Sequence, residues 1–207
     1  MVVIVDYDAG NLRSVQRACE QVGIKADITA DPETVLKAGK VIFPGVGSAV
    51  SAVDTLRDRG LGEAITEFYR SGKPLLGICL GLQIALDRTE EGEKECLGLI
   101  SGACRKFEFA DKSFKVPHIG WNELEIVQPH PMLKNIKSGD EFYFVHSYHA
   151  HLDNEAEIFG TTNYGDMTFT SAIGKDNFFA TQFHLEKSGK IGLKLLAEFK
   201  GWEGGLC

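Results

Sequence analysis

The stretch of residues 73–83 constrains this chain more than any other, and it reads Lys-Pro-Leu-Leu-Gly-Ile-Cys-Leu-Gly-Leu-Gln. Its first half is a short apolar run of the kind that a strand buried inside a parallel sheet requires. Cys79 follows directly, and the residues after it can continue as a helix. Gly77 and Gly81 flank the cysteine with the spacing of a nucleophile elbow, in which glycines relieve the crowding of a strained turn. The stretch therefore predicts a cysteine at a sharp turn from a strand into a helix.

A cysteine at such a turn is placed for chemistry in two ways. Its sulfur stands at the carboxyl end of the strand, where open α/β sheets hold their sites. It also precedes a helix, whose dipole favours a thiolate over a thiol. A lone cysteine between two packed elements is more often a buried structural residue. Here the flanking glycines and the strand-to-helix context favour the nucleophile, so Cys79 is the first candidate catalytic residue.

Composition excludes several classes of function. The net charge of −7 disfavours non-specific nucleic-acid binding and docking on an anionic membrane. No apolar run approaches the roughly 18 residues of a membrane span, and the first residues are typical of a strand rather than a signal peptide. The length of 207 residues suits one domain, residues 1–207.

The cysteines indicate the redox compartment. They are odd in number, widely spaced and without a C-x-x-C pair, which favours a reducing, cytoplasmic location over a disulfide framework or a zinc site. Besides Cys79 they are Cys19, Cys96, Cys104 and Cys207. Cys19 shares one apolar helix face with Leu12 and Val15, so we expect it in the core.

Strand and helix patterns alternate through the first half of the chain. Apolar runs at 2–6, 26–29, 40–43 and 74–78 predict strands. The stripe of Leu61, Ala64, Ile65 and Phe68 predicts a helix, and Asp31-Pro32 opens another as its cap and first turn. This alternation predicts a doubly wound, mainly parallel α/β sheet with helices on both faces.

The second half has a different texture. Short β-like runs separated by glycine and aspartate turns occupy 123–127, 141–145, 158–161, 168–173 and 178–182. We expect them to form an antiparallel β extension that covers or extends one edge of the sheet. A last helix begins near residue 187 and turns Ile191, Leu195 and Phe199 inward.

A nucleophilic cysteine needs a base, and the base needs a group that orients it. His184 follows an apolar run and so stands at a strand end, and Glu186 lies two residues further on. In an extended segment these two side chains point to the same side, where the carboxylate can hold one imidazole nitrogen while the other faces the thiol. His146, His149 and His151 form the competing group, but alternating positions on a strand without nearby carboxylates favour a structural or surface role over a metal site.

A glycine-rich segment supplies the remaining group that acyl chemistry requires. Pro44-Gly45-Val46-Gly47 ends an expected parallel strand, and its glycines allow backbone N–H groups to turn toward a ligand. A tight βα turn would look the same. Together with the cysteine, however, an N–H near Val46 and the N–H of Leu80 could bind a developing oxyanion.

These residues together resemble the class I, triad-type glutamine amidotransferases. The resemblance rests on Gly77-Ile-Cys-Leu-Gly-Leu-Gln83, Pro44-Gly-Val-Gly47 and Gln182-Phe-His-Leu-Glu186. Three more stretches resemble the glutaminase subunits of imidazole glycerol phosphate synthase, from histidine biosynthesis: Asp6-Tyr-Asp-Ala-Gly-Asn11, Pro117-His-Ile-Gly-Trp-Asn122 and Tyr143-Phe-Val-His-Ser-Tyr148. The resemblance spans nearly the whole chain and implies a flavodoxin-like fold.

The resemblance also implies roles for individual residues. Cys79, His184 and Glu186 would form a catalytic triad that hydrolyses L-glutamine to L-glutamate and ammonia through a thioester, with no metal or organic cofactor. Glutamine would be held by Gly45, Gly47, Gln83, Glu91, His146, Ser147 and Tyr148. A separate cyclase subunit, the partner in a heterodimer, would face Asn11, Trp121, Asn122, Tyr143 and Lys187 and receive the ammonia. One departure is Leu185, where the family usually has proline.

Three alternatives remain open from the sequence. The chain could be another triad glutaminase subunit, serving anthranilate or pyridoxal phosphate synthesis, although the stretch 117–122 argues against it. It could be a catalytically silent, glutaminase-like binding subunit, which the complete triad argues against. It could also be a γ-glutamyl peptide hydrolase that acts alone. Trp121 has an alternative of its own, as a core aromatic rather than an interface residue in a glycine-flanked loop.

Overall fold

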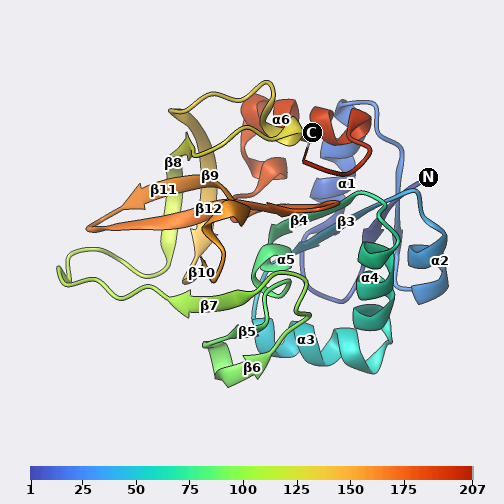
Figure 1. Ribbon diagram of the computed structural model, residues 1–207, viewed down its shortest axis with the longest axis horizontal. Coiled ribbons are helices and arrows are strands. Elements are labelled where there is room, and N and C mark those ends of the chain that lie inside the picture. The colour runs from blue at the N-terminus through green and yellow to red at the C-terminus, as the bar shows by residue number, and fades with distance from the viewer. Residues whose placement is uncertain (207) are drawn as a thin grey trace.

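A mixed β-sheet runs through the computed structural model, which describes residues 1–206 (Figure 1). Cys207 lies outside the described residues. Five strands in the order β2-β1-β3-β4-β13 are parallel to one another. They are β1 (Val2–Val5), β2 (Ala26–Thr29), β3 (Lys40–Gly45), β4 (Leu75–Cys79) and β13 (Phe178–Thr181). The expected mainly parallel α/β sheet is therefore confirmed.

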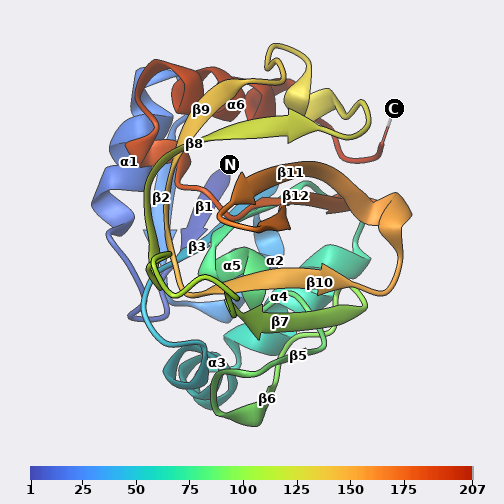
Figure 2. The ribbon, with the colours of Figure 1, turned by 90° about the vertical axis from the view of Figure 1, so that its left-hand side faces the viewer.

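Helices cover both faces of the parallel part. One face packs against α1 (Leu12–Gln21) and α6 (Gly189–Gly201), and the other against α2 (Pro32–Lys37), α3 (Ala49–Asp58) and α4 (Leu61–Arg70) (Figures 1 and 2). Alternation along each strand divides the two cores, because successive side chains point to opposite faces. In β1, for example, Val3 and Val5 pack toward α2, α3 and α4, whereas Ile4 packs toward α1 and α6.

Beyond β13 the sheet becomes mainly antiparallel and divides. β12 (Met167–Lys175) pairs with β13 and then with two branches. One branch contains β10 (Tyr148–Leu152), β7 (Gly102–Lys106) and the two-residue strands β5 (Arg88–Thr89) and β6 (Lys94–Glu95). The other contains β11 (Ile158–Tyr164), β8 (His118–Ile126) and β9 (Asp140–His146). Figure 2 shows the two branches diverging from β12. Phe144 and Phe169 pack together in the core of this part of the molecule.

Two expectations about strands are wrong. The run 178–182 was expected among the antiparallel strands at an edge, but β13 is parallel to β4 and lies inside the sheet. All four β13 residues are buried, as is typical of a strand covered on both faces. His146, His149 and His151 do not share one strand, because Ser147 separates β9 from β10.

The described chain contains elements that the patterns did not indicate. α3 has only Ala49, Ala52 and Leu56 buried, so its apolar stripe is too small to stand out in sequence. β7 and β10 pair with each other and carry few large apolar residues. Short one-turn 3-10 helices occur as well, at η1 (Glu91–Glu93), η2 (Pro131–Leu133), η3 (Glu155–Glu157) and η4 (Leu185–Lys187). Within residues 1–206, no helix combines the length and the apolar character needed to cross a bilayer.

Candidate active site

Cys79 ends β4 and is the first residue of a sharp turn into α5 (Leu80–Gln83). Its φ of 53° lies in the left-handed region that residues with a side chain rarely adopt, so the backbone is strained at this point. Both flanking glycines are required by packing. A Cβ on Gly81 would lie 1.8 Å from the Phe43 carbonyl oxygen, and a Cβ on Gly77 would lie 2.8 Å from the Ala180 Cβ. The predicted elbow is confirmed.

The helix after the elbow is short. α5 has only four residues, so its macrodipole is small. The charge that opposes the thiolate comes instead from His184, which stands at the end of β13, the strand next to β4.

His184 and Glu186 form a buried pair. His184 Nδ1 lies 2.7 Å from Glu186 Oε1, and the two side chains are 2% and 5% exposed. Burial lowers the pKa of His184, but the negative charge of Cys79 and the carboxylate of Glu186 outweigh it and raise the pKa above its usual value. His184 Nε2 makes no hydrogen bond to another group of the described chain and is left for the sulfur. Such a pair favours a thiolate beside an imidazolium.

The route by which Glu186 reaches His184 differs from the expected one. An extended segment was expected, but residues 185–187 form the 3-10 helix η4. The turn brings the carboxylate back to the ring all the same. Leu185, in the position where the family usually has proline, is 1% exposed and packs in the core with Phe183 and Leu195.

A cleft of about 380 Å³ opens beside the sulfur. It is lined by Cys79, by both expected oxyanion residues, Val46 and Leu80, and by Lys187. Six of the seven expected glutamine-binding residues line it as well: Gly47, Gln83, Glu91, His146, Ser147 and Tyr148. Pro117 and Val145 also line the cleft and were not expected there, although both lie in the quoted stretches 117–122 and 143–148.

The loop at Val46 is held close to the nucleophile. β3 extends two residues further than expected, so that Gly45 pairs with Cys79 across the sheet. Gly45 itself does not line the cleft, and a Cβ on it would lie 1.9 Å from the Tyr7 hydroxyl. That hydroxyl donates a hydrogen bond of 2.7 Å to the Pro44 carbonyl. Gly47 has a φ of 99°, which requires glycine, and Val46 is 38% exposed.

Glu91 has a structural partner inside the cleft. Its Oε2 accepts a hydrogen bond of 2.8 Å from the Ala49 N–H and so caps α3, whose own cap residue Ser48 makes no side-chain cap bond. A carboxylate has a second oxygen, which leaves capacity for the ammonium group of an amino-acid substrate.

The five expected partner-facing residues are placed in two ways. Trp121 is 53% exposed, and its ring meets Tyr143 edge-on at 6.1 Å, while Lys187 Nζ lies 5.9 Å from the Tyr143 ring centre. Trp121 is on β8, not in a loop as expected, and its exposure excludes the core alternative. Asn11 and Asn122 have internal partners: Asn11 caps α1, and Asn122 Nδ2 donates to the Asn163 carbonyl at 2.8 Å.

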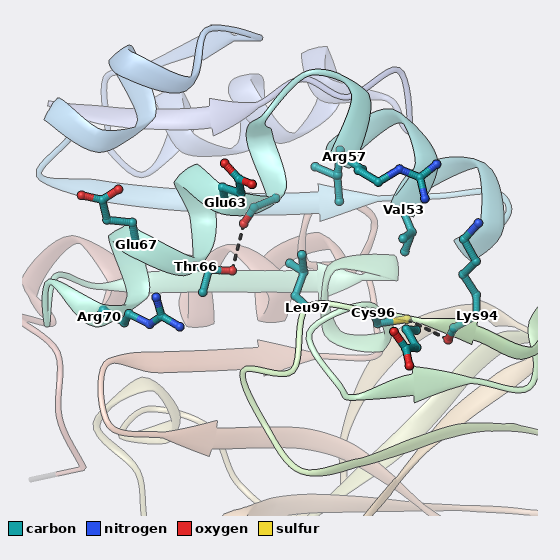
Figure 3. A pocket seen from close by; sticks show the side chains of 12 residues that line it. Val53, Arg57, Glu63, Thr66, Glu67, Arg70, Lys94, Cys96 and Leu97 are labelled. Atoms are coloured by element: carbon teal, nitrogen blue, oxygen red, sulfur yellow. Dashed lines mark hydrogen bonds between the residues drawn. The ribbon is translucent and has the colours of Figure 1, made fainter.

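A larger hollow of about 840 Å³ lies elsewhere, between α3, α4 and the segment 94–97 (Figure 3). Charged side chains of both signs line it, including Arg57, Glu63, Glu67 and Arg70. It contains no residue of the predicted site. Among residues 1–206, no three His, Cys, Asp or Glu side chains are grouped so that they could hold a metal ion, and this includes the histidine group at 146, 149 and 151. Burial of His146 lowers its pKa to about 3, so its ring is neutral.

Chemically, the cleft brings a strained cysteine and a glycine-rich loop together at one end of a parallel sheet, and an imidazolium that a carboxylate supports stands at the end of the next strand. This set is suited to attack on an amide or ester carbonyl with a covalent thioester intermediate. The narrow cleft and the carboxylate of Glu91 favour a small substrate that carries an ammonium group.

Comparison with known proteins agrees with this chemistry. The family model described as "Glutamine amidotransferase class-I" matches residues 3–200. Imidazole glycerol phosphate synthase subunit HisH of Desulfovibrio desulfuricans is 47% identical over 204 residues, covering 96% of this chain and 93% of that protein. Subunit HisH of Sulfurimonas denitrificans is 46% identical over 202 residues, covering 96% and 97%.

Solved structures share the fold at lower sequence identity. A crystal structure of a glutamine amidotransferase has a TM-score of 0.75 at 19% identity and covers 98% of this chain and 100% of that chain. The structure of PurLQS from Thermotoga maritima has a TM-score of 0.73 at 18% identity and covers 97% of each chain.

Proposed function

The chain belongs to the class I glutamine amidotransferases and, among them, to the HisH subunits of imidazole glycerol phosphate synthase, and from this premise we propose how its residues act. It is a glutaminase subunit that hydrolyses L-glutamine to L-glutamate and ammonia in L-histidine biosynthesis. The observation that carries the residue assignment is that Cys79, on its strained elbow at the cleft, ends the strand next to the one that leads to the buried His184–Glu186 pair.

The reaction begins with the thiolate of Cys79, which attacks the side-chain amide carbon of glutamine. Backbone N–H groups near Val46 and at Leu80 stabilise the oxyanion. The His184 imidazolium gives its proton to the leaving nitrogen, so the C–N bond breaks and ammonia departs. The high pKa of His184 keeps that proton available at neutral pH.

The second half of the reaction hydrolyses the γ-glutamyl thioester. His184 is now neutral and accepts a proton from a water that attacks the thioester carbonyl. The carbon–sulfur bond breaks, glutamate leaves, and thiolate and imidazolium are restored. Glu186 holds the ring through Nδ1 and supports its positive charge in both halves.

Glutamine occupies the 380 Å³ cleft in this proposal. Glu91 binds the ammonium group with the carboxylate oxygen that does not accept from the Ala49 N–H. Gly47, Gln83 and the backbone of residues 146–148 enclose the rest of the substrate. Gly45 acts indirectly, because it makes room for Tyr7 behind the loop. Residues 1–207 form one amidotransferase domain in this proposal. A reducing, cytoplasmic location is proposed as well, and the free cysteines Cys19, Cys79, Cys96 and Cys104 support it.

A cyclase subunit of imidazole glycerol phosphate synthase is the proposed partner, in a heterodimer. The surface formed by Trp121, Tyr143 and Lys187 supports this, since it lies beside the cleft mouth and exposes an aromatic residue of the kind that dominates interfaces. Asn11, which caps α1, and Asn122, which donates to the Asn163 carbonyl, are proposed to meet the partner with their remaining hydrogen-bonding capacity.

The first experiment replaces the nucleophile. Cys79→Ser in the complex with the cyclase should abolish glutamine-dependent synthesis and leave ammonia-dependent synthesis intact, because only one sulfur atom changes. Substantial glutamine turnover in this variant would show that Cys79 is not the nucleophile, and trapping of Cys79 by a glutamine-analogue electrophile provides the positive control.

The second experiment tests the partner. Glutamine hydrolysis is measured with the chain alone, with the cyclase, and with the cyclase plus its nucleotide ligand. We expect the rate to rise along this series, because a ligand that favours the active state of the loop at Val46 raises its population. Equal rates in all three would contradict the coupling.

The third experiment tests the surface. Trp121→Ala should weaken assembly or release ammonia to solvent, whereas Val127→Ala, which removes a residue 55% exposed elsewhere, should do neither. An unchanged complex with unchanged ammonia transfer in Trp121→Ala would remove Trp121 from the interface.

A further inference from the structure

Gln182 approaches the nucleophile although nothing above gives it a role. It follows β13, and the register that pairs Thr181 with Ile78 brings it alongside Cys79. Its side chain is fully buried, and its Nε2 lies 3.6 Å from the Cys79 sulfur. We propose that Gln182 is a further catalytic residue, whose amide donates a hydrogen bond to the Cys79 thiolate and holds the sulfur in place for attack. This inference rests on the proposed role of Cys79 as nucleophile.

The orientation of the Gln182 amide follows from its neighbours. Gln83 Nε2 lies 3.0 Å from the Tyr148 carbonyl oxygen, which can only accept, so the Gln83 atom at that position is the NH₂ group. The same NH₂ group lies 3.2 Å from the Gln182 amide, which must therefore present its oxygen. The other end of the Gln182 amide is then its NH₂ group, which donates and cannot accept. That end faces the sulfur.

The Tyr148 carbonyl that sets this orientation is itself held from the other side. It accepts a hydrogen bond of 2.8 Å from His146 Nδ1. Because a carbonyl cannot donate, the proton of the neutral His146 ring is on Nδ1, and Nε2 accepts from His118 Nδ1 at 3.3 Å. Asn122 Nδ2 lies 3.4 Å from His118 Nε2, so the donors run from Asn122 through both histidines to the Tyr148 carbonyl, which accepts from Gln83 as well. The amide of Gln182 thus has one satisfied arrangement.

A donor at this position acts on the two forms of the cysteine unequally. Hydrogen bonds to an anion are stronger than those to a neutral acceptor, so the Gln182 amide favours thiolate over thiol. The amide does not titrate and keeps this effect at every pH at which the protein is folded. His184 faces the same sulfur from its own side, and its charge depends on pH. Gln182 therefore supplies stabilisation of the thiolate that does not depend on the protonation of His184.

The surroundings explain why a polar side chain at this position needs these partners. The adjoining residues Phe179, Ala180, Thr181 and Phe183 are all fully buried. An amide in such surroundings destabilises the fold unless its polar ends are bonded. Here both ends are, one to Gln83 and one to the sulfur.

The test replaces Gln182 by methionine, which has a similar volume and no donor. In the complex with the cyclase, the rate of Cys79 alkylation by iodoacetamide is followed against pH. We expect the profile of Gln182→Met to shift to higher pH, with about a tenfold lower rate on its acid side, about a tenfold lower kcat for glutamine hydrolysis and little change in KM. Ammonia-dependent synthesis should be unchanged.

Two further variants show whether an effect comes from the lost donor or from lower stability. Gln182→Glu places an acceptor against the sulfur and should lower the alkylation rate more than Gln182→Met does. Thr181→Val removes a buried hydrogen bond of the same strand end, from Thr181 Oγ1 to the Phe183 carbonyl, without contact to the sulfur. It should lower stability and leave the alkylation profile in place.

The outcomes separate this inference from the proposal beneath it. If Cys79 remains the residue that is alkylated and required for glutamine turnover, and Gln182→Met has the wild-type profile, the role of Gln182 is refuted and the triad is not. If Gln182→Met does not fold, a measurement on the wild-type protein still tests the inference. The side-chain amide resonances of Gln182 in the wild-type complex should shift when Cys79 is alkylated and loses its charge, and unshifted resonances would overturn the inference.

Discussion

Replacing Glu186 by glutamine removes one charge from the site and almost no volume. The amide oxygen can still accept the bond from His184 Nδ1, so the ring keeps its orientation. What is lost is the charge that supports the imidazolium, across a contact of 2.7 Å between side chains only 2% and 5% exposed.

The size of the effect follows from the kind of hydrogen bond. A bond to a charged group is worth about 1.5–3 kcal/mol and a neutral one about 0.5–1.5 kcal/mol, so the change removes about 1–2 kcal/mol of support for the imidazolium. This corresponds to about a 5- to 30-fold lower kcat. KM should change little, because Glu186 does not line the cleft.

The pH profile should change in a defined direction. The carboxylate is one of the groups that raise the pKa of His184, so the variant has a lower His184 pKa. The imidazolium needed to protonate the leaving ammonia is lost as the pH rises through that pKa. The alkaline limb of kcat for glutamine hydrolysis by the complex should therefore move to lower pH.

A matched control keeps the interpretation specific. Glu63→Gln removes the same charge from α4, at the larger hollow of Figure 3, and should leave kcat and the alkaline limb unchanged. Wild-type turnover with an unshifted limb in Glu186→Gln would refute the reasoning and remove Glu186 from the mechanism. A loss beyond about a thousandfold would refute the magnitude, because one charge-assisted bond cannot account for it.

Further predictions concern stability. Cys19→Ser places a hydroxyl at a fully buried position, so it should lower the free energy of unfolding in urea by about 1–3 kcal/mol and leave kcat unchanged. A variant with lower kcat and normal stability would contradict this. Gly81→Ala places a Cβ 1.8 Å from a carbonyl oxygen, so it should lower the free energy of unfolding by at least about 3 kcal/mol and abolish activity. Gly201→Ala has open space around the new Cβ and should be neutral or stabilising. Equal effects of the two substitutions would refute the packing argument. Burial lowers the pKa of His130 to about 4, below the value of about 6.5 expected in the unfolded chain. Between these two values the unfolded chain binds a proton that the folded chain does not. The free energy of unfolding should therefore fall by up to about 3 kcal/mol as the pH is lowered from about 6.5 to about 4. His130→Asn keeps an acceptor for the Met132 N–H and should reduce this pH dependence, to which the other buried histidines also contribute. Denaturant unfolding measures it, and an unchanged slope would exclude a contribution from His130.

The sequence by itself determined the local geometry of the site. The glycines around Cys79 predicted the strained elbow, because a turn of that kind has no room for a Cβ at either position. The two-residue spacing of His184 and Glu186 predicted the pair, and it survived a change of local structure from extended to 3-10, since either conformation keeps the two side chains within reach. The alternation of apolar runs and amphipathic stripes similarly predicted the parallel sheet and its two layers of helices.

Contacts between distant segments were decided by the tertiary structure. Nothing local indicates that β13 lies beside β4, and the sequence analysis assigned that run to the antiparallel edge. Sheet order depends on which strands can bury both of their faces, and that is a property of the whole chain. The cap that Glu91 provides for α3, and the split of the histidines between β9 and β10, have the same origin.

Gln182 illustrates the division most clearly. In the sequence it is a polar residue two positions before His184, and no spacing indicates a contact to Cys79, 103 positions earlier. Parallel pairing of β13 with β4 brings the two together, and the Gln83 amide, which donates to both the Tyr148 carbonyl and the Gln182 amide oxygen, then orients the Gln182 amide. Spacing along the chain determined which side chains could carry out chemistry. Only the packing of strands far apart in sequence decided which atoms surround the sulfur, because hydrogen bonds depend on distances in space and on which partner is free to donate.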